Sequence, residues 1–368
     1  MSISGKKIWI DIEEPKTAVM FNPLINMFHN EGIELLITAR DYDSTYQILD
    51  DQNVNYEKIG KHGGEKLEDK LKEYIERLSE LFPVVKRFKP DYFVTFSSVE
   101  GTRIAYGLKI QSIGFNDEPR NEPVCKLILP FLDKIITPQC VPQEWYTRLN
   151  ADPSKLIRYN GIDEIGWLSY YKPNHKILER YNLEKGNFVI IRSEPSFASY
   201  FIEKLKAEET LITEFFPPIF KRFPNLKYFL LVRTKKQEEF LNKRLKNFSK
   251  AKNVLITRYL PTVDLCFYGA LIISGGGTIV RESSLLNIPS IEYFPGDTAP
   301  QENFLIENGF PLEHIKDPEK IIERSTEILN QKPSSDRFNL SFSEKIKKFE
   351  NPNQICFDFI RKKLLEIN

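Results

Sequence analysis

The stretch that decides the fold runs from Leu271 to Phe310, LIISGGGTIVRESSLLNIPSIEYFPGDTAPQENFLIENGF. It opens with an apolar run, Leu271–Ser274, which predicts a buried strand. Three glycines, Gly275, Gly276 and Gly277, then lead into a helix that is expected to begin near Thr278. Glycines at such a turn let the backbone approach a phosphate, and the first N–H groups of the helix favour an anion. The sequence therefore predicts an anion site at this turn.

Polar side chains follow the turn at positions that suit a nucleotide-sugar. Glu282 lies about one turn into the helix, where a carboxylate can accept both hydroxyls of a ribose. A second strand, Ser290–Phe294, is followed by Asp297 and Gln301, which we expect to reach the same site. The alternative is that the glycines, with Ser274, only form a tight turn and that Glu282 is a solvated helix residue. The full order of strand, turn, helix, strand and polar loop favours binding.

The same alternation of short apolar runs and helical patterns continues through the chain. Such strands, separated by helices, are typical of parallel sheets covered on both faces. We predict an α/β protein of two doubly wound Rossmann-like domains facing across a cleft. The domains are residues 1–168 and 169–342, and residues 343–368 form a helical segment that is expected to pack back on the first domain. The other predicted strands are Lys7–Asp11, Glu34–Ala39, Tyr56–Ile59, Tyr92–Ser97, Ser112–Phe115, Lys134–Thr137, Phe188–Arg192, Tyr228–Arg233 and Val254–Thr257.

Composition excludes several classes of protein. The chain has 368 residues, 41% of them hydrophobic, which is enough for packed cores. Its 52 Lys and Arg residues balance 51 Asp and Glu, and the formal net charge of +1 argues against a nucleic-acid binder. The apolar run Ile8–Ile12 is too short for a signal peptide, and no run is long enough to span a bilayer. We expect a soluble cytoplasmic protein.

Cysteine and histidine spacing argues against a metal. The four cysteines lie far apart with no CxxC pair, and the four histidines form no cluster. We expect neither a disulfide framework nor a metal site, and no cofactor apart from the substrate itself.

Carboxylates follow two strands of the first domain. Asp117, Glu118 and Glu122 come after the strand Ser112–Phe115, where ionisable groups suit acid–base chemistry or sugar binding. The alternative is a charged loop that caps the next helix. Asp11, at the end of the first strand, is a candidate base for an acceptor, and helix capping explains it equally well.

Three further residues are candidates because of their place after a strand. His62 lies in a loop with two glycines and is a candidate to bind the acceptor or to act as a base. Arg192 ends the first strand of the second domain, where a guanidinium can bridge diphosphate oxygens. Arg258 follows the third strand of that domain, in a loop that we expect to contact the base of the nucleotide.

The stretch Leu271–Phe310 resembles the nucleotide-sugar site of GT-B enzymes. It is similar to the MurG-type N-acetylglucosaminyltransferases and to the UDP-N-acetylglucosamine 2-epimerases. The resemblance implies that Gly276 and Gly277 face the diphosphate, that Glu282 holds the ribose and that Gln301 contacts the donor sugar. In the epimerases, acidic residues in a stretch like the one that contains Glu122 serve catalysis.

The whole chain also resembles an uncharacterised prokaryotic family of predicted glycosyltransferases. Two departures from related enzymes stand out: Thr17 replaces a histidine of relatives, and Phe96-Ser97-Ser98 stands where the epimerases carry an aspartate. The matching segments are KIWIDIEEP, LLITARDYDST, IGKHGG, FSSVEGTRIAYGL, FNDEPRNE, LDKIITP, YNGIDE and SGGGTIVRESSLL.

These resemblances imply the GT-B fold and a metal-independent glycosyltransferase. It would move an N-acetylglucosamine-type sugar from a UDP-sugar to a glycan, a lipid-linked molecule or a small molecule, with peripheral membrane contact if the acceptor is a lipid. One alternative is a 2-epimerase, in which the acids from Asp117 to Glu122 would move protons at C2 of the sugar. The other is a non-catalytic protein that binds a nucleotide-sugar.

Overall fold

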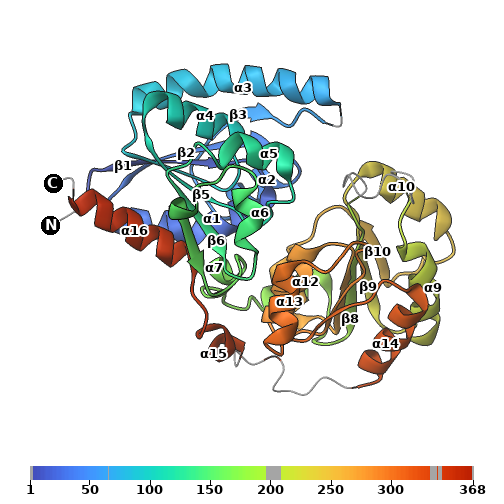
Figure 1. Cartoon of the computed structure of the whole chain (residues 1–368). Coiled ribbons are helices and arrows are strands. Elements are labelled where there is room, and N and C mark those ends of the chain that lie inside the picture. Colours follow the sequence, from blue (N-terminus) through green and yellow to red (C-terminus); the bar gives the residue numbers. More distant parts are fainter. Residues whose placement is uncertain (1–2, 65, 196–208, 332–337, 339–341, 367–368) are drawn as a thin grey trace. The chain divides into compact units, whose positions relative to one another are not determined.

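The computed structural model of the protein describes residues 3–64, 66–195, 209–331, 338 and 342–366. The chain divides into two compact α/β units (Figure 1), unit 1 being residues 1–170 with 349–368 and unit 2 being residues 171–348. The predicted domain boundaries after residues 168 and 342 lie near these limits. Among the described residues, no helix combines the length and the apolar composition that crossing a bilayer requires.

Unit 1 is built on a parallel sheet of seven strands in the order β3-β2-β1-β4-β5-β6-β7. The order reverses between β1 and β4, because the chain returns from the edge strand β3 to the centre of the sheet. In doubly wound sheets, ligands bind beyond the carboxyl ends of the strands at such a reversal. The strands are β1 (Lys7–Ile12), β2 (Glu34–Asp41), β3 (Glu57–Lys61), β4 (Tyr92–Thr95), β5 (Gln111–Phe115), β6 (Lys134–Pro138) and β7 (Leu156–Tyr159).

Helices cover both faces of this sheet. On one face α1 packs against α2, α7 and α16, and on the other α3 packs against α4 and α4 against α5 (Figure 1). In α1, Phe21, Leu24 and Phe28 are buried on one face, as their spacing predicts. The helices of unit 1 are α1 (Pro15–Asn30), α2 (Thr45–Asp51), α3 (Leu67–Phe88), α4 (Val99–Leu108), α5 (Glu122–Ile128), α6 (Gln143–Thr147), α7 (Ile165–Leu168) and α16 (Pro352–Glu366).

The last helix of the chain belongs to unit 1. The helical segment predicted for residues 343–368 consists of two helices, α15 (Phe342–Ile346) and α16, which begins at Pro352. The rings of Phe28 in α1 and Phe357 in α16 lie 5.6 Å apart. The Asn353 side chain donates hydrogen bonds to the carbonyls of Met20 and Gly166, at 2.7 and 3.0 Å. These contacts attach α16 to both α1 and α7.

Unit 2 is built on a parallel sheet of six strands in the order β10-β9-β8-β11-β12-β13, which reverses between β8 and β11. The strands are β8 (Phe188–Arg192), β9 (Lys227–Leu231), β10 (Val254–Thr257), β11 (Leu271–Ser274), β12 (Ser290–Glu292) and β13 (Leu312–His314). The remaining helices are α8 (Lys176–Tyr181), α9 (Ile212–Arg222), α10 (Lys235–Arg244), α11 (Thr262–Tyr268), α12 (Gly277–Leu285), α13 (Pro300–Glu307) and α14 (Pro318–Asn330).

Two edge strands were not predicted from the sequence. The strand β13 has three residues, and β7 has the sequence LIRY, with only Tyr159 fully buried. Edge strands need fewer apolar residues because one side has no neighbour, so their pattern is weak.

Candidate functional site

The glycine turn lies at the reversal point of the sheet in unit 2, directly after β11. The Ser274 hydroxyl accepts a hydrogen bond from the Gly276 N–H at 3.1 Å and donates one to the Gly276 carbonyl at 2.8 Å. Gly276 is the N-cap of α12 and Gly277 its first residue. The first N–H groups of α12, with Thr278 in the first turn, therefore begin at the carboxyl edge of the sheet, where an anion can accept them.

Gly275 lies against the end of β8 too closely for any side chain. Its N–H donates to the Arg192 carbonyl at 3.0 Å. A Cβ atom added to Gly275 would lie 2.6 Å from the Cα of Glu194. The turn therefore needs glycine at position 275, because its backbone touches the backbone of Glu194.

Glu194 holds this corner of unit 2 together. Its buried carboxylate accepts hydrogen bonds from the Thr210 hydroxyl at 2.7 Å, the Leu211 N–H at 2.8 Å and the Tyr293 hydroxyl at 2.8 Å. Next to it, the Arg233 Nε donates to the Ser193 carbonyl at 3.1 Å. This bond places the Arg233 guanidinium beside Gly276, since a Cβ there would lie 2.6 Å from one of its nitrogens.

Two predicted binding residues lie buried around the turn. Glu282 is 5% exposed in α12, and Gln301 is 1% exposed in α13. Burial and the charge of Glu282 raise the pKa of the Cys266 thiol, and the charge of Arg192 opposes this shift. Glu282 and Arg192 therefore both lie near Cys266. Beside them, Arg281 of α12 and the buried Glu302 of α13 form an ion pair at 3.6 Å. The chain thus brings Arg192, Ser274–Thr278, Glu282 and Gln301 to the carboxyl edge of one sheet.

Two predicted binding residues lie on the surface instead. Arg258 is exposed and pairs with Glu238 of α10 at 3.3 Å. Asp297 is fully exposed and lies 3.9 Å from Lys316. Neither joins the buried group around the glycine turn.

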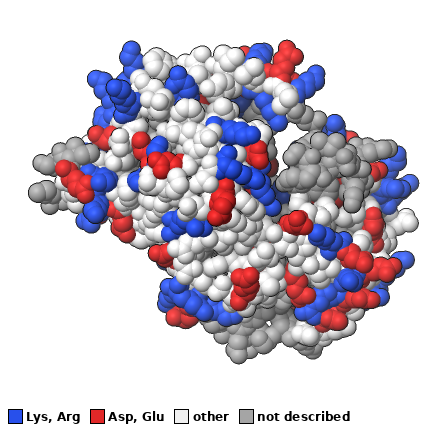
Figure 2. Space-filling model, viewed as in Figure 1, with Lys and Arg blue, Asp and Glu red and all other residues white. Residues whose placement is uncertain are grey.

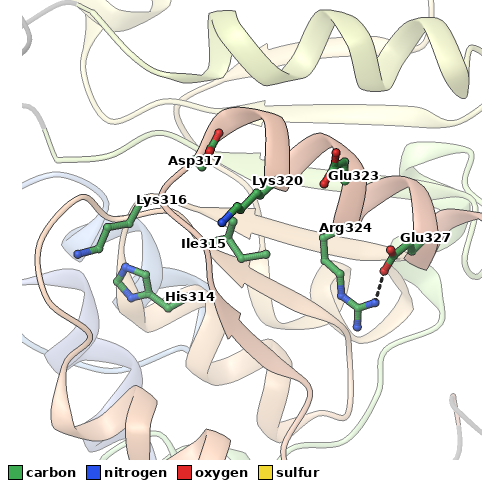
Figure 3. Close-up of a pocket in the computed structure, with 8 residues that line it drawn as sticks. All are labelled: His314, Ile315, Lys316, Asp317, Lys320, Glu323, Arg324 and Glu327. Carbon is green, nitrogen blue, oxygen red and sulfur yellow. Dashed lines mark hydrogen bonds and ion pairs between the residues drawn. The ribbon is translucent and has the colours of Figure 1, made fainter.

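A cavity of about 440 Å³ lies elsewhere in unit 2, between the end of β13 and α14 (Figure 3). Arg324 in its wall pairs with Glu327 at 2.6 Å and with Glu313 at 2.7 Å. The lining carries charges of both signs and contains none of the turn residues, so we do not assign the ligand site to it. The lining residues are His314, Ile315, Lys316, Asp317, Lys320, Glu323, Arg324 and Glu327.

In unit 1, Asp11 is fully buried at the end of β1. Its carboxylate accepts hydrogen bonds from the hydroxyls of Thr38 and Ser98, both at 2.5 Å. It also forms an ion pair with the buried Arg77 of α3 at 2.6 Å, and Arg77 lies 3.3 Å from Glu100. Both carboxylate oxygens of Asp11 are engaged, which favours a structural role and argues against the predicted role as a base.

A second carboxylate group lies at the same edge of this sheet. The Lys16 ammonium donates to Asp117 at 2.7 Å and to Asp163 at 2.8 Å. We call Lys16, Asp117 and Asp163 the Lys16 cluster. The Tyr159 hydroxyl donates to the other oxygen of Asp163 at 2.5 Å, and the Lys16 ammonium lies 4.4 Å from the centre of the Phe96 ring.

Burial and the neighbouring charge of Asp117 raise the pKa of Asp163 to about 7. Burial and the charge of Asp11 raise the pKa of Glu13, which accepts a hydrogen bond from Thr95 at 2.8 Å, to about 8. Carboxyl groups that exchange a proton near neutral pH are suited to general acid–base catalysis. The edge of the sheet in unit 1 can therefore hold or move a proton.

The other predicted catalytic residues are less suited to that role. Glu118 is partly exposed and pairs with Arg120 at 2.5 Å, and Glu122 is also partly exposed, with its pKa lowered by the hydrogen bond from Lys126. His62 is half-buried, and burial and the charges of Arg40 and Lys70 lower its pKa to about 4. A group that gives up its proton so readily is a weak base.

Sequence reasoning missed Lys16, Asp163 and Glu13 as site residues. Glu13 and Lys16 lie beside the predicted candidate Asp11, and Asp163 follows the unpredicted strand β7. Their position directly after strands of a parallel sheet could have indicated that these residues belong to the site. In the described part of the chain, no group of three or more His, Cys, Asp and Glu side chains is placed to hold a metal ion.

Two Rossmann-type sheets, each with its strand order reversed at the centre, define a protein of the GT-B class. The chain belongs to the family described as "Protein of unknown function (DUF354)", whose model matches residues 6–364. It is 27% identical to an uncharacterised protein of Methanocaldococcus jannaschii over 320 residues, 86% of this chain and 89% of the relative.

Solved structures with the same fold include epimerases and a transferase. The UDP-GlcNAc 2-epimerase of Neisseria meningitidis, bound to UDP-GlcNAc, has a TM-score of 0.66 at 16% identity, covering 98% of this chain and 100% of that chain. The epimerase of Methanocaldococcus jannaschii, in complex with UDP-GlcNAc and UDP, has a TM-score of 0.65 at 16% identity, covering 93% and 98%. The glycotransferase of kitacinnamycin has a TM-score of 0.60 at 11% identity, covering 98% and 99%. These likenesses establish the GT-B fold.

Proposed function

We propose that the protein is a glycosyltransferase that moves an N-acetylglucosamine-type sugar from a UDP-sugar to an acceptor. The observation that carries this proposal is the glycine turn at the reversal point of the sheet in unit 2, with Glu282 buried in the helix that follows. A helix N-terminus there suits a diphosphate, and a carboxylate nearby suits a ribose. Several solved proteins of the same fold are described by their titles as binding UDP or UDP-GlcNAc.

The departing diphosphate would be stabilised by this chain's own groups. The N–H groups at the start of α12 and the guanidinium of Arg192 supply partial and full positive charge at the carboxyl edge of the sheet. Such preorganised donors stabilise charge that develops as the sugar–phosphate bond breaks. We therefore expect transfer without an added divalent metal.

We assign the acceptor-side base to the Lys16 cluster. Asp117 and Asp163 are buried and share one ammonium group, so a proton taken by one carboxylate leaves the other paired with Lys16. Asp117→Asn is expected to lower kcat by about a hundredfold to ten-thousandfold while UDP-sugar binding stays unchanged. Glu144→Gln, an exposed residue on α6, is the matched control.

The first test is a thermal-shift panel of UDP, GDP, CDP and TDP sugars, in which only UDP forms are expected to raise the melting temperature. In titration calorimetry, Glu282→Gln is expected to weaken UDP binding about tenfold to a hundredfold, since hydrogen bonds to a charged group contribute about 1.5–3 kcal/mol each. Glu239→Gln, exposed on α10, should bind UDP normally. No shift with any nucleotide would refute the proposal.

A 2-epimerase is the second candidate, and the Lys16 cluster is the observation that favours it. Carboxyl groups that exchange protons near pH 7 can remove the proton at C2 while UDP leaves C1, which forms a C1–C2 double bond. Return of a proton to the other face of C2 and of UDP to C1 then gives the epimer. UDP-N-acetylglucosamine incubated alone in D2O separates the two reactions. Deuterium at C2, or free UDP without an acceptor, indicates the epimerase, whereas no change until an acceptor is added indicates the transferase.

A further inference from the structure

One surface of unit 1 is unusually apolar. Of the twelve large apolar side chains that are exposed among the described residues, eight lie on α3, α4 and α5 or directly after α5. We call these eight the apolar belt: Leu67, Leu71, Ile75 and Phe82 on α3, Tyr106 and Leu108 on α4, Leu127 on α5 and Phe131 after it. Leu67 is 83% exposed and Leu71 60%.

The residues of the apolar belt share one helical layer. Helix α3 packs against α4, and α4 against α5. The rings of Tyr106 and Phe131 meet edge to face with their centres 5.1 Å apart. In Figure 2 this layer lies along the top of the view, where mostly uncharged atoms lie between a basic group at the left and mixed charges at the right.

The size of the apolar belt is that of an interface. Its side chains are between 37% and 83% exposed, and large side chains present about 200 Å² each. The belt therefore exposes roughly 800 Å² of apolar surface, more than the largest patch on a typical monomer. One partner of a standard protein–protein interface buries about this area.

The charges on α3 indicate which partner fits. The helix carries five acidic and five basic residues, LEDKLKEYIERLSELFPVVKRF, whereas a helix that binds an anionic membrane surface carries a basic excess on its polar face. Acidic residues dominate its first turn and basic residues its last turn, Glu68 and Asp69 against Lys86 and Arg87. Such a helix is complementary to an antiparallel copy of itself.

The spacing along α3 supports the same arrangement. Leu71, Ile75, Leu78 and Phe82 follow the 4-3-4 spacing of helices that pack side by side. Leu78 is partly buried against the core of unit 1, and the other three are exposed. Glu68 and Lys86 are eighteen residues apart, which is five full turns, so both lie on one edge of this stripe. The stripe is centred between Glu76 and Arg77 and the charged pair is centred at Arg77, so the two midpoints differ by about 1 Å along the helix.

We propose that the apolar belt is the interface of a homodimer, in which α3 pairs antiparallel with α3 of a second copy across a twofold axis near Glu76. About that axis Leu71 faces Phe82 of the partner subunit, and Glu68 faces Lys86 of the partner subunit. Each contact occurs twice, as an isologous interface requires. The dimer would be independent of the reaction that the protein catalyses.

Analytical ultracentrifugation of the full chain tests the proposal, and a reversible dimer is expected. Ile75→Lys should raise the dissociation constant about a hundredfold, because each dimer carries the substitution twice and a central interface residue contributes about tenfold. Ile75 is 55% exposed, so the monomer should keep its circular dichroism spectrum. Leu255→Lys, at a residue that is 45% exposed on the edge strand β10, is the matched control and should dimerise normally.

Charge reversal tests the antiparallel register. Glu68→Lys and Lys86→Glu should each weaken the dimer roughly threefold to tenfold, because like charges then meet at two contacts. The double variant should regain the original dissociation constant, since both contacts are restored with their signs exchanged. A pairing other than the proposed one would leave the double variant no better than the single ones, and the register would be wrong.

A monomer at all concentrations would overturn the proposal. So would a dimer that Ile75→Lys leaves unchanged, because the interface would then lie elsewhere. Sedimentation with phosphatidylglycerol vesicles tests whether the apolar belt binds a membrane instead. If the protein is a monomer that binds these vesicles, and Ile75→Asp abolishes this binding, the apolar belt is a membrane-binding surface and the dimer is refuted.

Discussion

The glycine turn allows a paired test of packing and of ligand approach. A Cβ atom added at Gly275 would lie 2.6 Å from the Cα and 2.7 Å from the backbone nitrogen of Glu194. Glu194 cannot move away easily, because Thr210, Leu211 and Tyr293 all donate to its carboxylate. Overpacking of a rigid site typically costs about 1–3 kcal/mol. We expect Gly275→Ala to lower the free energy of unfolding by that amount in urea titrations followed by circular dichroism.

Gly276→Ala is the matched variant for ligand approach. Its Cβ would meet the guanidinium end of Arg233 at 2.6 Å, a flexible group that can move. The φ angle of Gly276 is −162°, an extended conformation that any residue adopts. Stability should therefore fall by less than about 1 kcal/mol. The methyl group would displace Arg233 and narrow the approach to the first N–H groups of α12, so UDP affinity should fall about tenfold.

Two results would refute this reasoning. If Gly275→Ala is as stable as the natural chain, the turn is not packed against Glu194 as described. If Gly276→Ala binds UDP with unchanged affinity in titration calorimetry, a phosphate does not approach this turn. Measuring both variants by both methods separates a loss of fold from a loss of ligand.

Three further outcomes follow from the ionisable groups of unit 1. Arg77→Met should lower the free energy of unfolding by about 3–5 kcal/mol, because it leaves Asp11 buried without its cation. Adding Asp11→Leu to this variant should recover part of that loss. If the two substitutions instead lower the free energy of urea unfolding additively, the ion pair does not contribute as described. The pKa of Asp163 is about 7, above the ordinary 3.8. Between these two pH values the folded state holds a proton that the unfolded state has lost. This group therefore makes the free energy of unfolding fall as pH rises from the lower value to the higher one. Asp163→Asn should flatten that fall in unfolding measured across the window, and an unchanged slope would count against the raised pKa. The ring protons of His62 should titrate in NMR with a pKa of about 4, and a midpoint near the ordinary 6.5 would mean that its surroundings are wrongly described.

The alternation of strands and helices could be predicted because it is local. Apolar runs such as Phe188–Arg192 and Leu271–Ser274 become central strands at the predicted residues, because a parallel strand covered on both faces is apolar at nearly every position. The glycine turn could be predicted for the same reason, since strand, turn and helix are consecutive. The short edge strands β7 and β13 could not, because their few residues carry little pattern.

The carboxylate groups of unit 1 show where sequence reasoning ends. Asp11 at a strand end has the same local pattern whether it is a base or a structural ion, and the decision rests on Arg77, 66 residues further along the chain. The Lys16 cluster joins residues that are 101 and 147 positions apart. Such groups are assembled by the fold, so no single segment announces them.

The return of the final helix to the first unit has a consequence for synthesis and for fragments. The chain passes between the units twice, near residues 170 and 349, so unit 2 is continuous in sequence and unit 1 is not. A ribosome that has released residues 1–348 has supplied all of unit 2 but not α16, whose Asn353 bonds α1 and α7. The amino-terminal half should therefore mature last, and a fragment that stops before Phe349 should expose the side of α1 that α16 covers.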